Sequence, residues 1–351
     1  MLTVFLYIAY LVFACVLFYT IHKQPKIQYH SAKPYSPIKC VVVVPFRNEV
    51  NKLPILIQSI RALKTQHQVS WVFVNDHSTD GGESLITQSD NTTLINLPEN
   101  NTCKKQALIF GLERHEANCF ICIDADVSFN ADWLDNLLAP IVGDKASWVI
   151  GPVNIASTGS SFLSTMQNIE WQALQKITHY FALLQKPILC NGANLAFSST
   201  LKAFALDALK NQTTASGDDL SLMQEFKRIN AKVCFGNNAA TVNTDFPDTW
   251  KGFVNQKLRW AKKMNGQWNS TTKIGLLMAG FQVLLLLVWL FGSIKNALLC
   301  TVIKFVADSL IANNFNVLNI PYWSMLQIYP LILWIIQPFV RLQWKDREIK
   351  A

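Results

Sequence analysis

Apolar residues gather at the two ends of this 351-residue chain, and this uneven distribution limits the folds it can adopt. Half of the residues are hydrophobic, and the stretch from Lys39 to Gly266 is the part with ordinary mixed composition. That stretch is long enough to bury one sizeable core. We therefore predict an N-terminal transmembrane anchor at residues 1–22, one globular domain at 39–266, and C-terminal transmembrane or interfacial helices at 274–340.

The N-terminal apolar run, Leu2 to Ile21, has the length needed to cross the hydrocarbon core of a bilayer. His22, Lys23 and Lys26 follow it directly, with no basic region before the run and no small-residue cleavage site after it. This pattern favours an uncleaved anchor whose C-terminal end lies in the cytosol. We expect an integral membrane protein, of the bacterial inner membrane, with its globular domain in the cytosol.

The C-terminal apolar region contains up to three spans. Gly275–Gly292 is predicted as a membrane helix, and Asn296–Ala312 is a second candidate that carries Lys304 and Asp308. Val317–Val340 is interrupted by two prolines and fits either one kinked span or a broken, interfacial hairpin. The basic tail that follows prefers the cytosol, which an odd number of C-terminal crossings would contradict. The sequence leaves that number open.

The formal charge of +8 comes from dispersed Lys and Arg residues, with no basic tract interleaved with aromatic residues. We therefore expect no nucleic-acid partner, and attribute the charge to anionic lipid headgroups and a bound diphosphate. Among the eight cysteines, Cys119 and Cys122 form a CxxC pattern, but it lies in an apolar run that reads as a buried strand. No second pair follows at zinc-ligand spacing, so scattered cysteines in a reducing cytosol are expected.

From Lys39 onward, short runs rich in β-forming residues alternate with longer helical patterns. The predicted elements are a strand at Cys40–Pro45, a helix at Leu53–Lys64, a strand at Ser70–Asn75, a helix at Lys104–Glu116 and a strand at Phe120–Asp124. This alternation predicts an α/β fold with a mostly parallel central sheet and helices on both faces. In such sheets ligands bind beyond the carboxyl ends of the strands.

Polar residues follow each of the three strands. The first is followed by Arg47, Asn48 and Glu49, and the second by the run Asn75 to Gly81. The third runs into Asp124-Ala125-Asp126, where two carboxylates stand two residues apart. Carboxylate oxygens suit Mg²⁺ or Mn²⁺, which commonly share their coordination with substrate phosphates.

Two further motifs lie nearer the C-terminus. Gly217-Asp218-Asp219 precedes a helix predicted at Leu220–Arg228, with Asp218 expected as its N-cap. Gln256-Lys-Leu-Arg259-Trp260 stands just before the predicted membrane helix. An apolar stripe at helical spacing predicts an amphipathic core or interfacial helix, and its members are Phe162, Met166, Ile169, Trp171, Leu174 and Ile177. The histidines show no ligand spacing and are assigned no role.

The order of these motifs resembles the family 2 glycosyltransferases of GT-A fold, in particular membrane-integrated members with a QxxRW signature such as ceramide glucosyltransferases and hyaluronan or cellulose synthases. The matching pieces span most of the predicted soluble stretch, and they are Val43-Val-Pro45-Phe-Arg-Asn-Glu49, Val74-Asn-Asp76-His-Ser-Thr-Asp80-Gly81, Asp124-Ala-Asp126, Gly217-Asp218-Asp219 and Gln256-Lys-Leu-Arg259-Trp260.

The resemblance implies a role for each matching residue. It places donor-binding residues at Pro45, Arg47, Glu49, Asp76, Lys104 or Lys105, Asp124, Gln256, Arg259 and Trp260. Asp126 would be the metal ligand and Asp219 the general base. Asn191 and Asn194 lie where such enzymes contact the acceptor.

We therefore expect a metal-dependent, hexosyltransferase-like enzyme that moves a sugar, with inversion, from a nucleotide diphosphate donor to a membrane-associated acceptor. The chemistry needs a base for the acceptor hydroxyl, and a divalent cation with a guanidinium for the departing diphosphate. The short membrane portion favours single transfer to a lipid. Processive polysaccharide synthesis, a non-catalytic sugar-nucleotide-binding scaffold, and a nucleotidyl- or phosphotransferase remain alternatives.

Overall fold

The computed structural model of this chain describes residues 2–23, 36–156, 161–212, 217–264 and 270–313, with short pieces at 321–322, 325–326, 328–329, 332–333, 343–344 and 347–348. The chain divides into two compact units. The sheet unit comprises Ile27–Ala156 and Phe181–Asp245, and the helical unit comprises Met1–Lys26, Ser157–Tyr180 and Phe246–Ala351. The range 39–266, predicted as one domain, thus contributes to both units.

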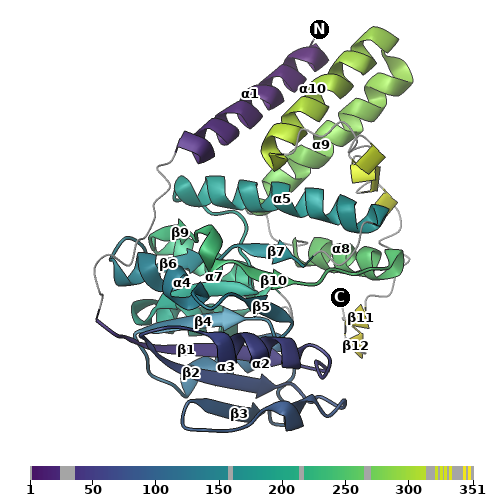
Figure 1. Cartoon of the computed structure of the whole chain (residues 1–351). Helices are drawn as coiled ribbons and strands as arrows, with labels where there is room; N and C mark the ends of the chain where they lie inside the picture. Colours follow the sequence, from purple (N-terminus) through teal and green to yellow (C-terminus); the bar gives the residue numbers. More distant parts are fainter. Residues whose placement is uncertain are drawn as a thin grey trace. The chain divides into compact units, whose positions relative to one another are not determined.

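The sheet unit is built on a seven-stranded sheet (Figure 1). Its strands, in spatial order, are β3 (Thr92–Asn96), β2 (Gln68–Asn75), β1 (Lys39–Phe46), β4 (Cys119–Ile123), β8 (Asn194–Ser198), β6 (Trp148–Ile150) and β9 (Val233–Phe235). Strands β3, β2, β1 and β4 are parallel, as are β6 and β9, whereas β8 is antiparallel to both its neighbours. The predicted, mostly parallel sheet is confirmed.

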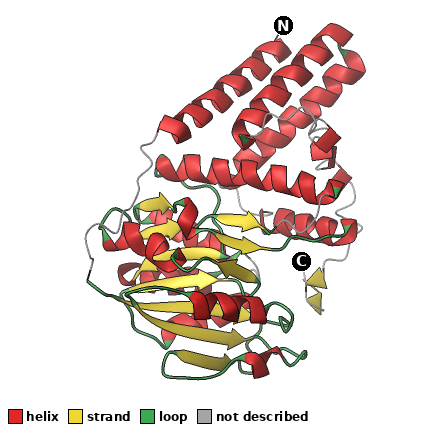
Figure 2. Ribbon diagram, viewed as in Figure 1, coloured by secondary structure: helices red, strands yellow, loops and turns green. Residues whose placement is uncertain are grey.

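Helices cover both faces of this sheet (Figure 2). They are α2 (Leu53–Ala62), α3 (Lys104–Glu113), α4 (Trp133–Val142), α6 (Lys202–Asn211) and α7 (Asp218–Arg228). Helix α3 packs on β1, β2 and α6, and α6 packs on α7, whereas α4 packs on β6 and β8. Because both faces are covered, β1 is buried from Cys40 to Phe46 and reads as a continuous apolar run.

A second, three-stranded sheet consists of β5 (Val127–Phe129), β10 (Val242–Thr244) and β7 (Val153–Ile155). Strands β10 and β5 are antiparallel, with Thr244 opposite Val127. One further step along this register sets the residue after β10, Asp245, across from the residue before β5, Asp126. Three short 3₁₀ turns complete the unit: η1 (Gly82–Leu85), η2 (Ser199–Leu201) and η3 (Asn238–Ala240).

Two sequence predictions concern the ends of elements in this unit. Cys119 and Cys122 lie in β4 as predicted, and burial raises the pKa of both thiols to about 12, so they stay protonated near neutral pH. The prediction of Asp218 as an N-cap is wrong. Helix α7 begins at Asp218, and its N-cap is Gly217, whose φ of 100° lies in the left-handed region that favours glycine.

The helical unit contains five helices in its described part, namely α1 (Leu2–Lys23), α5 (Phe162–Leu183), α8 (Trp250–Met264), α9 (Ser270–Phe291) and α10 (Ile294–Ala312). A short antiparallel pair, β11 (Gln343–Trp344) and β12 (Arg347–Glu348), lies near the C-terminus. Helix α5 carries the predicted amphipathic stripe. Most of the predicted third stretch, Val317–Val340, lies outside the described residues, although its described pieces between residues 321 and 333 are helical.

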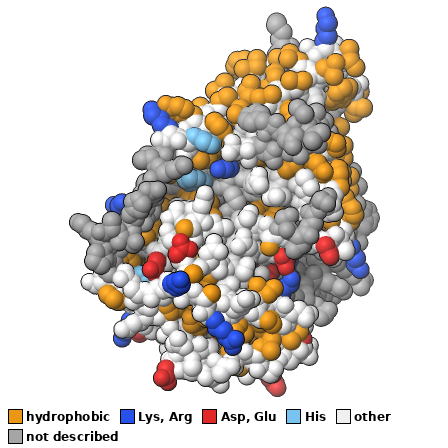
Figure 3. Space-filling view, viewed as in Figure 1, with side chains coloured by type: hydrophobic (Ala, Val, Ile, Leu, Met, Phe, Trp, Pro, Cys, Tyr) orange, Lys and Arg blue, Asp and Glu red, His pale blue; other side chains and the backbone are white. Residues whose placement is uncertain are grey.

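Helix α1 packs against α10 through Tyr10 and Ala14, which cluster with Ala307 and Ile311. Among the described residues, α1 is the one helix long and apolar enough to cross a membrane by length and composition. Large apolar side chains remain exposed on α1, α9 and α10 (Figure 3), and examples are Phe5, Val12, Leu286, Leu290 and Leu298.

Candidate active site

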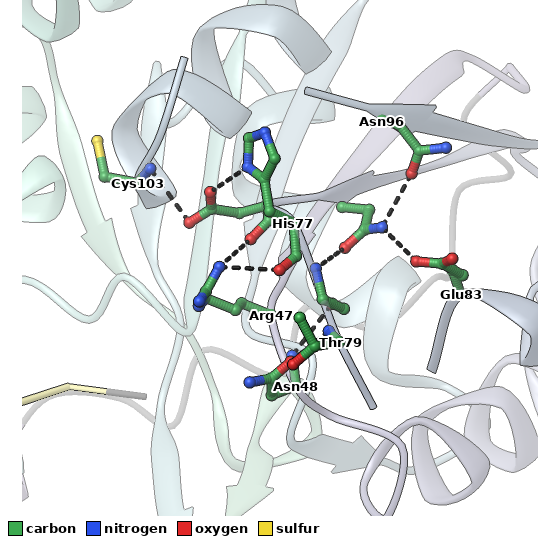
Figure 4. A network of polar contacts seen from close by, with 10 residues as sticks. Arg47, Asn48, His77, Thr79, Glu83, Asn96 and Cys103 are labelled. Atoms are coloured by element: carbon green, nitrogen blue, oxygen red, sulfur yellow. Dashed lines mark hydrogen bonds and ion pairs between the residues drawn. The ribbon is translucent and has the colours of Figure 1, made fainter. Parts of the chain in front are cut away.

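The loops that follow β1 and β2 are joined by side-chain bonds to the main chain (Figure 4). The Arg47 guanidinium donates from Nη1 to the carbonyl oxygens of Asp76 and His77, at 2.8 and 2.9 Å. The Asn48 side-chain oxygen accepts from the Thr79 amide at 2.9 Å. Arg47 therefore holds the loop after β2 at the end of β1, at the carboxyl edge where the sequence predicts a nucleotide pocket.

Asp76 and Asn75 hold the loop after β2 to other segments of the sheet unit. The Asp76 carboxylate accepts from the Cys103 amide at 3.1 Å and contacts His77 Nδ1 at 3.2 Å, and the residue is only 2% exposed. Asn75 donates to Glu83 at 2.6 Å and to Asn96 at 2.9 Å. Asp76 thus brings the start of α3 to the end of β2, and the prediction that it faces a base or ribose stays a prediction.

Three non-glycine residues at these loops have positive φ angles: Asn48 at 51°, His77 at 56° and Cys103 at 94°. Such conformations are costly outside glycine and persist where the surrounding bonds hold them, often at ligand sites. His77, to which the sequence assigns no role, also has a buried Nε2 atom with no hydrogen-bond partner within the described part of the chain. These features single out the loops around Arg47 and Asp76 as a candidate binding region.

Lys104, the first residue of α3, joins two of the acidic motifs. Its ammonium lies 2.6 Å from an Asp124 oxygen and 3.6 Å from an Asp218 oxygen. Desolvation opposes its charge, but Asp124, Asp218 and Asp219 together raise the pKa of Lys104. The carboxyl end of β4 and the first turn of α7 therefore meet at one partly buried ammonium.

Asp219 lies in the first turn of α7, where its carboxylate accepts a hydrogen bond from the Leu220 amide at 2.9 Å. The loop before β8 packs directly against it. A Cβ atom added at Gly192 would lie 3.1 Å from Asp219 Cβ and 3.4 Å from Lys104 Nζ. The predicted base thus sits beside Lys104 and the segment that begins at Asn191.

The two predicted acceptor residues are both buried. Asn191 is 8% exposed and donates to the Gly151 carbonyl at 2.9 Å. Asn194 is fully buried, donates to the Pro152 and Ala240 carbonyls at 2.8 Å each, and accepts from the Trp133 indole at 3.2 Å. Because its amide is already fully used, Asn194 is left out of the site proposed below.

Asp126 is partly exposed at the start of β5, and Asp245 lies across from it at the end of β10. Lys52 forms an ion pair with Asp245. The hydrogen bond to Asp245 raises the pKa of Lys52 despite desolvation, and the charges of Asp245, Asp126 and Glu49 act in the same direction. The Lys52 ammonium therefore lies within the electrostatic field of all three carboxylates.

This donor set fits a divalent metal of the Mg²⁺ or Mn²⁺ type. Such ions need one or two carboxylates when phosphates and water complete the coordination. No group of three or more His, Cys, Asp or Glu side chains is arranged as a full metal cage in the described ranges. Asp126 and Asp245 supply two carboxylates, which is the number that such an ion needs when phosphates and water complete its coordination.

The other predicted donor residues separate into distinct environments. Pro45 is buried within β1, opposite Val74. Lys105 donates to the Gln212 carbonyl at 2.6 Å, so of the two adjacent lysines it is Lys104 that reaches the acidic motifs. Gln256, Arg259 and Trp260 lie on α8 of the helical unit, each partly exposed.

These elements define an α/β domain with acidic residues gathered at the carboxyl edge of a mostly parallel sheet. The family model for glycosyl transferase family 2 matches residues 41–201, from β1 to η2. This stretch is therefore similar to the catalytic domain that the family model describes. The match includes Asp76, Lys104 and the Asp124–Asp126 motif, but ends before Asp219 and Arg259.

The likeness to a solved mannosyltransferase supports the same fold. A mannosyltransferase from Pyrobaculum calidifontis, PcManGT, solved with GDP-Man and Mn²⁺, is 16% identical with a TM-score of 0.55, and the likeness covers 94% of this chain and 99% of that one. Mannosyl-3-phosphoglycerate synthase from Rubrobacter xylanophilus is 13% identical, with a TM-score of 0.45 and coverage of 71% of this chain and 82% of that one. S. aureus TarS with UDP-GlcNAc is also 13% identical, with a TM-score of 0.44 and coverage of 78% and 81%. A search of curated proteins finds no match.

Sequence reasoning missed Asp245 and Lys52. Asp245 stands outside any recognised motif, and its neighbours Thr244 and Phe246 give no ligand spacing. The antiparallel register between β5 and β10 is what places it beside Asp126. Strands of three residues each are too short to predict such a register from sequence.

Proposed function

We propose that this protein is a membrane-anchored inverting glycosyltransferase, which transfers a sugar from a nucleoside diphosphate donor to an acceptor at the membrane. The observation that carries the proposal is the convergence on Lys104 of Asp124 from the β4 edge and Asp218 from the start of α7. A single ammonium holds together the two acidic motifs that sugar transfer requires.

Asp219 is proposed as the general base. In the proposed step, Asp219 takes the proton of an acceptor hydroxyl as that oxygen attacks the anomeric carbon. The new bond forms on the face opposite the leaving group, so the configuration inverts. The bond between the anomeric carbon and the phosphate oxygen breaks, and the nucleoside diphosphate leaves with the electron pair.

We propose that several groups stabilise the negative charge on the leaving diphosphate. Asp126, with Asp245 across the ladder, would hold the divalent cation, which supplies Lewis-acid stabilisation to the phosphates when bound. Asp124, held by Lys104, would orient the donor. Arg259 would grip phosphate oxygens with its planar guanidinium.

The loops fixed by Arg47 and Asp76 are proposed to receive the nucleoside. Pro45 and Glu49 would line the same pocket, and Gln256 and Trp260 would serve the diphosphate and the acceptor mouth. The solved mannosyltransferase holds GDP-Man and Mn²⁺, which supports a nucleotide sugar and a divalent metal here.

The apolar ends of the chain support the proposal of a lipid acceptor and a cytosolic active site. Helix α1 has the length and composition of a span, and the apolar surfaces of α9 and α10 suit the same environment. An acceptor confined to the bilayer would reach an enzyme anchored there at high local concentration. Single transfer to a lipid is therefore proposed ahead of polymer synthesis.

The test is a donor screen with the full-length protein in detergent or vesicles. Release of nucleoside diphosphate is measured for a panel of UDP- and GDP-sugars, with membrane lipid extract as acceptor and Mn²⁺ or Mg²⁺ present. We expect release with one donor class, loss of release on chelation, and a product one sugar larger than the lipid.

Asp219→Asn is expected to lower turnover by about 10²- to 10⁴-fold, because the base is lost while the shape is kept. Nucleotide binding by this variant should match the wild type, and Asp207→Asn on exposed α6 surface serves as control. Wild-type turnover in Asp219→Asn would remove the assigned base. Pyrophosphate or a phosphorylated lipid as product would favour nucleotidyl or phosphoryl transfer, and a growing polymer would favour a processive synthase.

A further inference from the structure

Three polar groups meet inside the helical unit. The Glu170 carboxylate of α5 receives the Lys257 ammonium of α8 at 2.6 Å on one oxygen, and the Tyr329 hydroxyl donates to the other. The Lys257 side chain is 5% exposed and that of Glu170 is 17% exposed. Both oxygens of the largely buried Glu170 carboxylate therefore have a partner, one an ammonium and the other a hydroxyl.

Lys257 also lies over two aromatic rings of its own helix. Its ammonium is 4.4 Å from the centroid of the Trp260 ring and 5.4 Å from that of Phe253. A cation over an indole face at this distance is attracted by the ring's charge distribution, more strongly where water is excluded. Lys257 therefore contacts both the Glu170 carboxylate and the Trp260 ring.

The Trp260 ring is enclosed on further sides by aromatic residues. Trp171, one residue after Glu170 on α5, has its ring centroid 5.9 Å from that of Trp260. Phe246 lies 6.2 Å away at an interplanar angle of 77°. The ring is thus bounded by Lys257, Trp171 and Phe246.

A buried ion pair seldom adds to the stability of a protein, because the desolvation of the two charges offsets their attraction. Proteins with apolar residues in place of the pair are often as stable. Such pairs are better attested as devices that fix one arrangement among several. Here the pair joins α8 to α5. Arg259 and Trp260 come two and three residues after Lys257 on the same helix, so a fixed rotation of α8 about its axis would also fix their directions.

We propose that Lys257 and Glu170 are positioning residues that orient the Trp260 ring and the Arg259 side chain. This inference rests on the proposed function, in which those two side chains serve the acceptor mouth and the diphosphate. Neither Lys257 nor Glu170 touches substrate in this proposal. Lys257 and Glu170 act on the reaction by fixing the orientation of α8 within the helical unit.

The experiment compares two buried ion pairs of the helical unit. Lys257→Met with Glu170→Met removes both charges of the proposed device. Lys304→Met with Asp308→Met removes a matched pair within α10, whose charged groups are 2.7 Å apart with side chains 3% and 8% exposed. Thermal stability, the donor KM and the KM for lipid extract are measured on the full chain for both double variants.

We expect each single variant, Lys257→Met or Glu170→Met, to lose stability, since it leaves one buried charge unpaired. The double variant should regain stability but keep a KM for lipid extract raised about tenfold, a loss comparable to one desolvated cation–π contact. Its donor KM should be raised as well, because Arg259 is no longer oriented toward the diphosphate. Lys257→Arg should keep near-wild-type values. The α10 double variant should leave both KM values unchanged.

Recovery of the lipid KM together with stability in the Lys257/Glu170 double variant would overturn the inference, as would an equal change in the α10 control. A wild type that releases no nucleoside diphosphate defeats the proposed function instead. In that case amide hydrogen exchange tests the inference independently of enzyme activity. We expect faster exchange at residues 256–260 in the first double variant and not in the α10 control, and unchanged exchange would refute it.

Discussion

Most polar side chains at the strand ends of the sheet unit bind the protein's own main chain. Arg47 holds two carbonyl oxygens, and Asp76 holds the Cys103 amide. These bonds fix two loops before any ligand arrives, so the loops are preorganised and little ordering is left to ligand binding. Asp126 and Asp219 remain partly exposed beside this frame, which is where groups that act on a substrate need to be.

Asp126 and Asp245 are the proposed ligands of the divalent metal. Asp126→Asn and Asp245→Asn should each raise the Mn²⁺ concentration needed for half-maximal nucleotide release, on the order of 10- to 100-fold, because each removes a charged oxygen ligand. A Mn²⁺ titration of activity, with Mn²⁺ binding by electron paramagnetic resonance, measures this. Asp90→Asn, at an exposed loop, is the control. An unchanged Mn²⁺ requirement in Asp245→Asn would exclude it as a ligand.

At the scale of elements, α3 connects the loops, the sheet and the acidic motifs. Its first residue, Lys104, reaches Asp124, and its later residues pack on β1 and β2. Gly111 makes this close approach possible, since a Cβ atom there would lie 2.4 Å from a Val43 methyl. The position of Lys104 therefore depends on a glycine nearly two turns further along the helix.

Gly111→Ala should destabilise the protein by about 1–3 kcal/mol, because the added methyl overpacks the contact with β1. Gly280→Ala in α9 is the matched control, since nothing lies within 4 Å of a Cβ atom there. The control should be neutral or slightly stabilising, as alanine favours helix over glycine. Chemical denaturation measures the free energy of unfolding of both variants. Equal values for the two would contradict the packing argument.

At the scale of the whole molecule, the directions of the apolar helices limit the membrane topology. Tyr7 clusters with Cys300, and Ala14 clusters with Ala307 and Ile311, so α1 and α10 run in the same direction. Helix α9 runs the opposite way, with the Trp289 indole bonded to Thr301 of α10 at 3.0 Å. If all three cross a bilayer, the ends of α1 and α10 emerge on the same side as the start of α9.

This arrangement predicts that the sheet unit and the C-terminal tail lie on the same, cytosolic side. Single cysteines placed at Thr102 and near Ala351, in a background without the eight native cysteines, should both be shielded from an impermeant thiol reagent in intact cells. Permeabilised cells should label both positions, which controls for burial. Labelling of the C-terminal cysteine alone in intact cells would require a third C-terminal crossing.

The sequence by itself determined the mostly parallel sheet, the strands that the first three motifs follow and the helical stripe of α5. These features depend on local periodicity and on strand and helix propensity, which a single chain displays directly. It also identified Asp126, Asp219 and Lys104 as candidates, although it did not separate Lys104 from Lys105 or identify the N-cap of α7. Those distinctions depend on which way a side chain points at the end of an element.

Only the tertiary structure decided which distant residues meet. It brought Asp245 opposite Asp126, gave Asn194 a fully buried role, and paired Lys257 with Glu170 across two helices. Each of these contacts depends on the register of short strands or the rotation of packed helices. Such geometry is set by the packing of many side chains at once, and no local pattern in the sequence records it.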